Sequence, residues 1–218
     1  AIFRGADLSN AIGSEGIFVG ADFSDVTASY AQFNNAQLGA TQWLRAEATR
    51  ADLSYSRLGR ANFREAEFIQ ANFKGARLSF ANLRYGIFQQ AIFDAAQLNN
   101  VQAERARLDS IRAVETDLTN SNFNEAFLWE ANLNRANLSG AKLVGATLTG
   151  ASLTSAIGLG TDLSEADLSG ASLNLADFSG ALLEQADLSG AVLAEAEFVG
   201  VDFTGANLYR AYLYSTNL

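Results

Sequence analysis

The chain repeats with a period of five residues along its whole length, without an inserted or deleted residue. The third residue of the block occurs 44 times, and it is Leu 24 times, Phe 13 times, Ala four times, Gly twice and Trp once. The first residue is Ala in 32 of the 44 blocks. Neither the 3.6-residue period of a helix nor the alternation of a flat strand fits this pattern. The period therefore predicts a solenoid in which every block has the same environment.

An apolar residue every five positions, with a small residue two positions earlier, suits a square coil with a short extended segment on each side. Four blocks close one coil of 20 residues, so the length predicts about eleven coils, or a rod roughly 50 Å long at strand spacing. Twelve of the 18 glycines fall at the fifth position, where a type II turn needs a positive φ. The absence of Pro fits a chain whose backbone N–H groups bond to the next coil.

The sequence pattern A(D/N)LXX recurs throughout, for example at Ala6–Asn10, Ala51–Leu53, Ala131–Leu133, Ala166–Gly170 and Ala186–Gly190. This pattern resembles the pentapeptide-repeat family, and the resemblance covers all 218 residues. The resemblance implies an all-β fold, the right-handed quadrilateral β-helix. Because the register has no break, we expect one domain over residues 1–218.

Departures from the repeat are interpreted as packing adjustments. Three blocks with Ala at the third position have a larger first residue, in the pairs Val26 and Ala28, Val101 and Ala103, and Ile111 and Ala113. Such pairs would restore the volume that a close-packed interior requires. Gly13 and Gly158 have no such compensation. We therefore expect the wall to bulge or loosen at these two glycines.

The composition argues against an enzyme. The chain has no His and no Cys, which excludes a Ser-His-Asp triad, a Cys nucleophile, His-ligated zinc and a His general base. Its only lysines are Lys74 and Lys142, and a filled rod offers no obvious cleft in which to tune carboxylates. We predict no catalytic residue, no cofactor-binding residue and no metal site.

The net charge of −9 is unevenly distributed: residues 1–120 carry 12 basic and 13 acidic groups, and residues 121–218 carry 3 and 11. Some members of the family resemble double-stranded DNA in shape and charge and bind DNA gyrase, and an acidic rod has the sign for this. The acidic groups concerned are Asp162, Asp167, Asp177, Glu184, Asp187, Glu195, Glu197 and Asp202. The competing interpretation is that the repeat itself places Asp at the second position, where nine of the 12 Asp occur.

Direct binding of nucleic acid is disfavoured by the arrangement of the basic residues. One predicted corner carries arginines interleaved with acids, namely Arg4, Arg45, Arg64, Arg84 and Arg105 with Asp25, Glu65 and Glu104. We interpret this corner as a solvated, ion-paired ridge.

Outward apolar residues indicate protein contacts more directly, although scattered exposed apolar residues are also normal. The candidate protein interface comprises Ile69, Ile87, Phe127 and Trp129, on one wall or its edge. At the last coil, Tyr209, Tyr212 and Tyr214 predict an end that is covered by a capping segment, by a second copy as a homodimer, or by another protein.

Together these features predict a non-enzymatic scaffold, a rigid rod that presents side-chain ladders to a protein partner of unknown identity. The alternative is an acidic, DNA-mimicking modulator of DNA gyrase. Similar Leu-rich repeats are abundant in cyanobacteria and in plastids, which implies a cytoplasmic or thylakoid-lumen setting. No apolar run is long enough to span a membrane.

Overall fold

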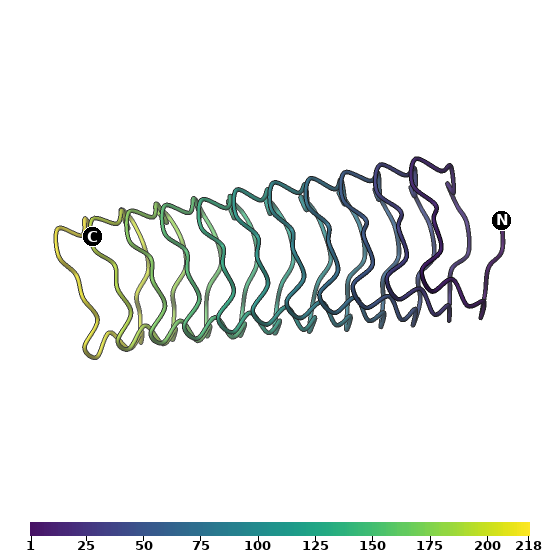
Figure 1. Cartoon of the computed structure of the whole chain (residues 1–218). Helices are drawn as coiled ribbons and strands as arrows, with labels where there is room; N and C mark the ends of the chain where they lie inside the picture. Colours follow the sequence, from purple (N-terminus) through teal and green to yellow (C-terminus); the bar gives the residue numbers. More distant parts are fainter.

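The computed structural model describes all 218 residues as a right-handed quadrilateral β-helix, a rod of stacked rectangular coils with the two termini at opposite ends (Figure 1). It contains no helix and no continuous strand. Instead, the second residue of each block forms an isolated parallel β-bridge with the residue 20 positions later, from Ile2 with Asp22 to Glu197 with Asn217. The predicted fold class and the coil of 20 residues are confirmed. No helix in the structure has the length and hydropathy of a membrane span.

The rod has four walls, each formed by one block per coil. Wall 1 begins with residues 1–5, wall 2 with 6–10, wall 3 with 11–15 and wall 4 with 16–20, and each wall recurs every 20 residues. Within a block the first and third side chains are buried, the second faces outward from the wall, and the fourth and fifth form the corner. Residues 20 apart therefore stack into columns that run along the rod.

Backbone hydrogen bonds join successive coils and close every corner except the one at Thr116, whose N–H makes no backbone bond. In the pattern that recurs along the rod, the N–H of Leu53 donates to the carbonyl of Asn72 at 2.8 Å, and the N–H of Asn72 donates to Ala51 at 2.9 Å. At the corners the first residue of a block donates back to the third residue of the preceding block, as from Ala6 to Phe3 at 2.9 Å. The coil is thus held by its backbone whichever outward side chains it carries.

The fifth residue of every block has a positive φ, as the predicted turn requires. Gly occupies 12 of these positions, but Glu, Arg, Tyr and even Phe80, at φ 63°, occupy others. A residue with a Cβ loses about 1–2 kcal/mol in this conformation. The bonds to neighbouring coils offset that strain, so the corner position tolerates side chains that a free turn would reject.

The interior is one continuous core of 65 buried residues. Its N-terminal half is aromatic, with Phe73 and Phe93 stacked at a centroid distance of 4.8 Å and an interplanar angle of 5°. Beyond residue 98 most inward side chains are Leu. The rod is therefore a filled cylinder with no internal channel.

The compensating pairs pack as predicted, since Val26, Val101 and Ile111 are all buried. At Ile111 the compensation is incomplete, because an apolar cavity of about 10 Å³ remains beside Ala113. This volume is at the lower limit for one water molecule, and its apolar lining is typical of a dry cavity.

The prediction that the wall bulges or loosens at Gly13 and Gly158 is wrong. The N–H of Gly158 keeps its regular bond to Asp177 at 2.7 Å, and that of Gly13 bonds to Gln32 at 2.7 Å. A Cβ on Gly158 would lie 2.2 Å from the ring of Phe178, the inward residue of the next coil. A Cβ on Gly13 would lie 2.7 Å from the ring of Phe33. Each glycine makes room for the phenylalanine above it, so the missing volume is supplied along the column.

Candidate interaction surfaces

The Asp residues of the repeat have a structural role. All nine second-position aspartates accept a hydrogen bond from the backbone N–H two residues later, as Asp187 does from Ser189 at 2.8 Å. Asn residues at the same position make the same contact, for example Asn62 with Arg64 at 3.2 Å. A short polar side chain thus satisfies an N–H at the corner, as in an Asx-turn. Acidity at the second position therefore has a cause within the fold, whichever partner it also serves.

These hydrogen bonds stabilise the carboxylate form. The hydroxyl and N–H of Ser24, together with the guanidinium of Arg4, lower the pKa of Asp22 from 3.8 to about 2. Bonds from the residue two positions on also lower the pKa of Asp7 and Asp202. At Asp167, burial raises the pKa, but bonds from Ser169 and Thr149 outweigh it and the net pKa is lowered.

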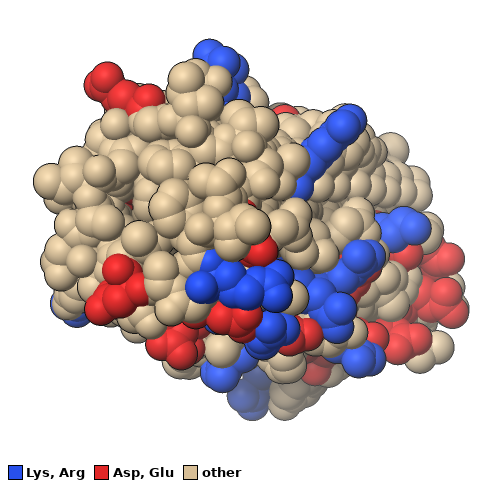
Figure 2. Space-filling model, turned by 90° about the vertical axis from the view of Figure 1, so that its right-hand side faces the viewer, with Lys and Arg blue, Asp and Glu red and all other residues tan.

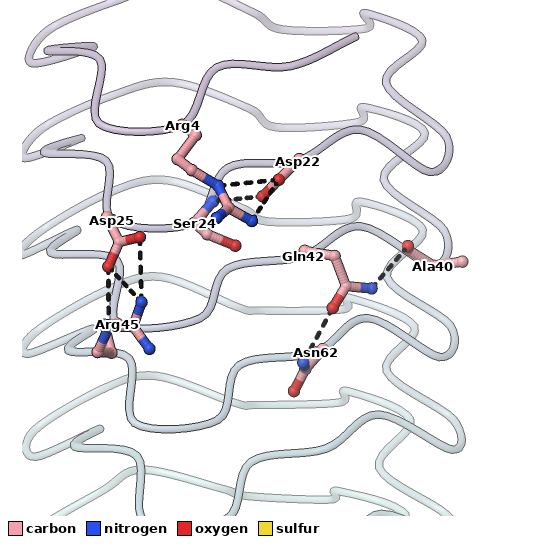
Figure 3. A network of polar contacts seen from close by, with 8 residues as sticks. All are labelled: Arg4, Asp22, Ser24, Asp25, Ala40, Gln42, Arg45 and Asn62. Atoms are coloured by element: carbon pink, nitrogen blue, oxygen red, sulfur yellow. Dashed lines mark hydrogen bonds and ion pairs between the residues drawn. The ribbon is translucent and has the colours of Figure 1, made fainter.

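The predicted basic corner is ion-paired throughout. Figure 3 shows Arg4 with Asp22 and Arg45 with Asp25, at 3.0 and 2.8 Å. The other pairs are Arg64 with Glu65 at 3.1 Å, Arg84 with Glu104 at 2.7 Å and Arg105 with Glu125 at 2.8 Å. Viewed from the N-terminal end, basic and acidic side chains interleave along the lower side of the rod (Figure 2). This corner is a mixed ridge, as predicted, and not a single-sign groove.

Amides form a second ladder beside this ridge on wall 1. Asn62 donates to Gln42 at 2.9 Å (Figure 3), and Asn82 donates to Asn62 at 3.1 Å. Arg84 bonds both oxygens of Glu104, at 2.8 and 2.7 Å, and this carboxylate raises the pKa of Arg84. Wall 1 is therefore internally satisfied, and it offers few free polar groups to a partner.

Wall 2 carries the candidate protein interface. Ile87 and Phe127 stand in one column with Arg107 between them. Phe127 and Trp129 are about half exposed, at 46% and 47%, whereas Ile87 and Ile69 are half-buried. The structure thus places all four predicted residues on one wall and its corner, in residues 66–130.

Two of the four, Ile69 and Trp129, close the ends of a shallow groove of about 490 Å³. The groove is also lined by Gln70, Gln89, Gln90, Arg107, Asp109 and Ser110. Gln89 donates to Asp109 at 2.9 Å in its floor. The sequence analysis missed this polar floor, although fourth-position residues read 20 apart, Ile69, Gln89, Asp109 and Trp129, would have revealed it.

Both ends of the rod expose apolar side chains. At the first coil Ile2, Ile12 and Ile17 are 74–82% exposed. At the last coil Tyr209, Tyr212 and Tyr214 are 55–65% exposed. The rings of Tyr212 and Tyr214 lie 6.3 Å apart, and Arg210 lies over the Tyr209 ring at 5.1 Å.

A solved structure with the same fold covers nearly the whole chain but is distant from it in sequence. HetL, a pentapeptide repeat protein involved in heterocyst differentiation regulation from the cyanobacterium Nostoc sp. strain PCC 7120, is 26% identical with a TM-score of 0.70. The match covers 97% of this chain and 88% of HetL. Among curated proteins, none matches the chain by sequence.

Two further structures match less well. A pentapeptide repeat protein from the Arabidopsis thaliana thylakoid lumen is 38% identical over 41% of this chain and 63% of its own, with a TM-score of 0.41. QnrB1, a plasmid-mediated fluoroquinolone resistance protein, is 23% identical over 83% of this chain and 88% of its own, with a TM-score of 0.47.

The sequence model for pentapeptide repeats matches eight copies over residues 1–41, 49–84, 71–110, 114–150, 148–185 and 181–218. These segments include nearly every coil of the rod. The chain therefore belongs to the pentapeptide-repeat family.

Proposed function

We propose that this protein is a non-enzymatic scaffold that binds a protein partner through wall 2. The observation that carries the proposal is the groove between Ile69 and Trp129, with Phe127 exposed beside it. Aromatic residues are enriched in the cores of protein interfaces, and the polar residues that line the groove supply hydrogen-bonding groups beside them. The rigid backbone of the coil holds these side chains in place, so binding requires little ordering of the surface.

The cyanobacterial source of HetL supports a partner in a cyanobacterium. A plastid, and the cytoplasm or the thylakoid lumen as the compartment, belong to this proposal on the resemblance of the repeats alone. The coil that carries the exposed Tyr209, Tyr212 and Tyr214 is a second contact in this proposal. A two-fold contact through Tyr209, Tyr212 and Tyr214 would cover that end without propagating into a fibre.

The proposal is tested by affinity capture from a cyanobacterial extract with three immobilised proteins. F127S/W129S removes the aromatic groups from wall 2, and Y55S/L175S removes two somewhat more exposed apolar groups from wall 3. We expect a protein that binds the wild type and Y55S/L175S but is at least tenfold depleted on F127S/W129S. Equal recovery on all three proteins would contradict a wall-2 interface.

The alternative function is modulation of DNA gyrase by an acidic rod. The absence of any basic residue between Lys142 and Arg210 favours it. Its test is a gyrase supercoiling assay with purified protein beside a variant carrying Asn at Asp162, Asp167, Asp177, Asp187 and Asp202. Asn keeps the corner hydrogen bond, as Asn62 shows, so this variant loses charge without losing the turn. Inhibition by the wild type alone would support DNA mimicry, whereas no effect of either protein would reject it.

A further inference from the structure

Wall 4 has small residues along parts of its corner. Its corner carries glycine at the fifth position in four successive coils, Gly140, Gly160, Gly180 and Gly200. The fourth position is Gly39 and Gly59 near the N-terminal end, where a Cβ would meet nothing closer than 3.7 Å. Large exposed side chains of the same wall include Phe80, Leu159 and Val199.

The charges of wall 4 are segregated by sign along the rod. Arg57 and Arg77 are exposed neighbours in its second-position column, and no ion pair includes either of them. Asp177 and Glu197 are neighbours in the same column, five coils further along. Like charges side by side on one face of a sheet are destabilising. A surface with the opposite order of charges would reduce the repulsion within the arginine pair and within the acidic pair at the same time.

We propose that wall 4 is a self-complementary surface through which two copies of this chain pair antiparallel. The two-fold axis lies in the interface plane, across the rods, midway between Asp117 and Asn137. It places Arg57 opposite Glu197 of the second copy and Arg77 opposite Asp177 of the second copy. Each ion pair then occurs twice, as an isologous contact requires.

The same axis matches large side chains with small ones at the corner. Because the axis runs across the rods, each position of a block faces the same position in the second copy. Opposed fifth-position residues are Arg60 with Gly200, Phe80 with Gly180, Asn100 with Gly160 and Asn120 with Gly140. At the fourth position Gly59 faces Val199, which is 51% exposed. Phe80, the largest apolar side chain of the wall and 57% exposed, would be covered over a glycine.

The area of the wall fits a weak but specific dimer. About ten coils at ~4.8 Å, each presenting about three extended residues at ~3.3 Å, give roughly 500 Å² per copy. The total of roughly 1,000 Å² is at the lower limit for specific interfaces. Electrostatic complementarity would fix the register more than it raises the affinity. Wall 2 cannot pair in this way, since Glu47 and Glu67 near one end would face Asp167 and Asp187 from the other.

Charge reversal with rescue tests the pairing by sedimentation at tens of micromolar and low salt. All proteins carry Y209S/Y212S/Y214S, which removes the end contact of the proposed function. R57E/R77E places acids opposite acids. D177N/E197R places a base opposite Arg57 and a neutral amide opposite Arg77. The amide oxygen introduced at position 177 can still accept the hydrogen bond that Asp177 accepts from the N–H of Ser179. We expect the parent to be dimeric and each charge variant to have a dimer dissociation constant raised at least tenfold.

An equimolar mixture of the two charge variants should form a heterodimer. In the mixed pair, the acid that R57E introduces faces the base that E197R introduces. The native residues Asp177 and Glu197 of the R57E/R77E copy face the native Arg77 and Arg57 of the D177N/E197R copy. The matched control R64E/R135E, on walls 1 and 3, changes the net charge by the same amount as R57E/R77E and should remain dimeric.

Three results would each overturn the proposal: a monomeric parent, an unaffected R57E/R77E protein, or a mixture that stays monomeric. Binding of a foreign acidic protein to the arginines of wall 4 would leave the parent monomeric and so count against the pairing.

Discussion

The indole Nε1 of Trp43 donates to Thr41 Oγ1 at 2.9 Å, and that hydroxyl donates to the carbonyl of Leu38 at 2.7 Å. Trp43 and Thr41 are 1% and 0% exposed, so water cannot replace either bond. Thr stands where the repeat normally has Ala, two positions before the one tryptophan among the inward residues. The pair explains how an indole fits a core in which no buried side-chain polar atom lacks a partner.

Thr41→Ala should therefore reduce the free energy of unfolding by about 1–3 kcal/mol, because it leaves the buried indole N–H unsatisfied. Thr41→Ser keeps the hydroxyl and should restore most of the loss. The measurement is denaturant unfolding followed by tryptophan fluorescence and by circular dichroism.

A double-mutant cycle isolates the pair. In a Trp43→Phe background, which has no indole donor, Thr41→Ala should cost less than in the wild type. Ser56→Ala is a matched control, because Ser56 donates to Leu53 at 2.6 Å but accepts no side-chain bond. Equal costs of Thr41→Ala in both backgrounds would show that the indole does not depend on Thr41.

The aromatic column provides a second prediction. Phe73 is fully buried and stacks on Phe93, so Phe73→Ala should reduce the free energy of unfolding by about 3–5 kcal/mol. Phe127→Ala, at an exposed second position, is the control and should change it by less than about 1 kcal/mol. A reversed order of the two variants would mean that the second position faces inward and the third faces solvent.

Much of the fold followed from the period alone, because burial, turn and bridge positions repeat every five residues. The inward third position and the positive φ at the fifth position could both be assigned from the sequence. The ion-paired corner was also predictable, because Arg45 and Asp25 differ by 20 residues, the length of one coil.

Packing along the columns was less predictable. Gly13 and Gly158 have no compensating residue within their own blocks, because the rings of Phe33 and Phe178 fill the space from the next coil. The groove on wall 2 also depends on contacts between coils. Its lining comes from four successive coils, and the depth of a groove depends on how long side chains such as Gln89 fold over their neighbours.

Stability should decline when the pH falls from about 4 towards about 2. The pKa of Asp22 in the folded protein is about 2, below the ordinary value of 3.8. The ionised carboxylate therefore contributes its full stabilisation of the fold at pH values above 3.8. This contribution is lost as the pH falls through the folded pKa of about 2. The lowered pKa values of Asp7, Asp167 and Asp202 act in the same direction. Thermal unfolding between about pH 5 and about pH 2 should show a falling midpoint.

Asp22→Asn tests the contribution of one carboxylate. Asn retains an oxygen for the N–H of Ser24 but cannot pair with Arg4 as a charge. The variant should be less stable than the wild type at about pH 5, and the difference should shrink by about pH 2. If the stability difference between Asp22→Asn and the wild type stays constant from about pH 5 to about pH 2, the effect arises from packing and not from charge.

The C-terminal coil provides the last prediction, tested in the R57E/R77E background so that pairing through wall 4 does not contribute. The exposed rings of Tyr212 and Tyr214 lie 6.3 Å apart on a coil in which N–H groups such as that of Leu208 make no backbone hydrogen bond. Such amphipathic rings favour an interface, and a two-fold contact would pair the open edge with itself. We expect R57E/R77E to sediment as a dimer at tens of micromolar, where even a ~µM dimer is populated. Adding Y209S/Y212S/Y214S should then yield a monomer. If R57E/R77E is already monomeric at this concentration, self-association at the end is excluded and a foreign partner is the better candidate for covering these three tyrosines.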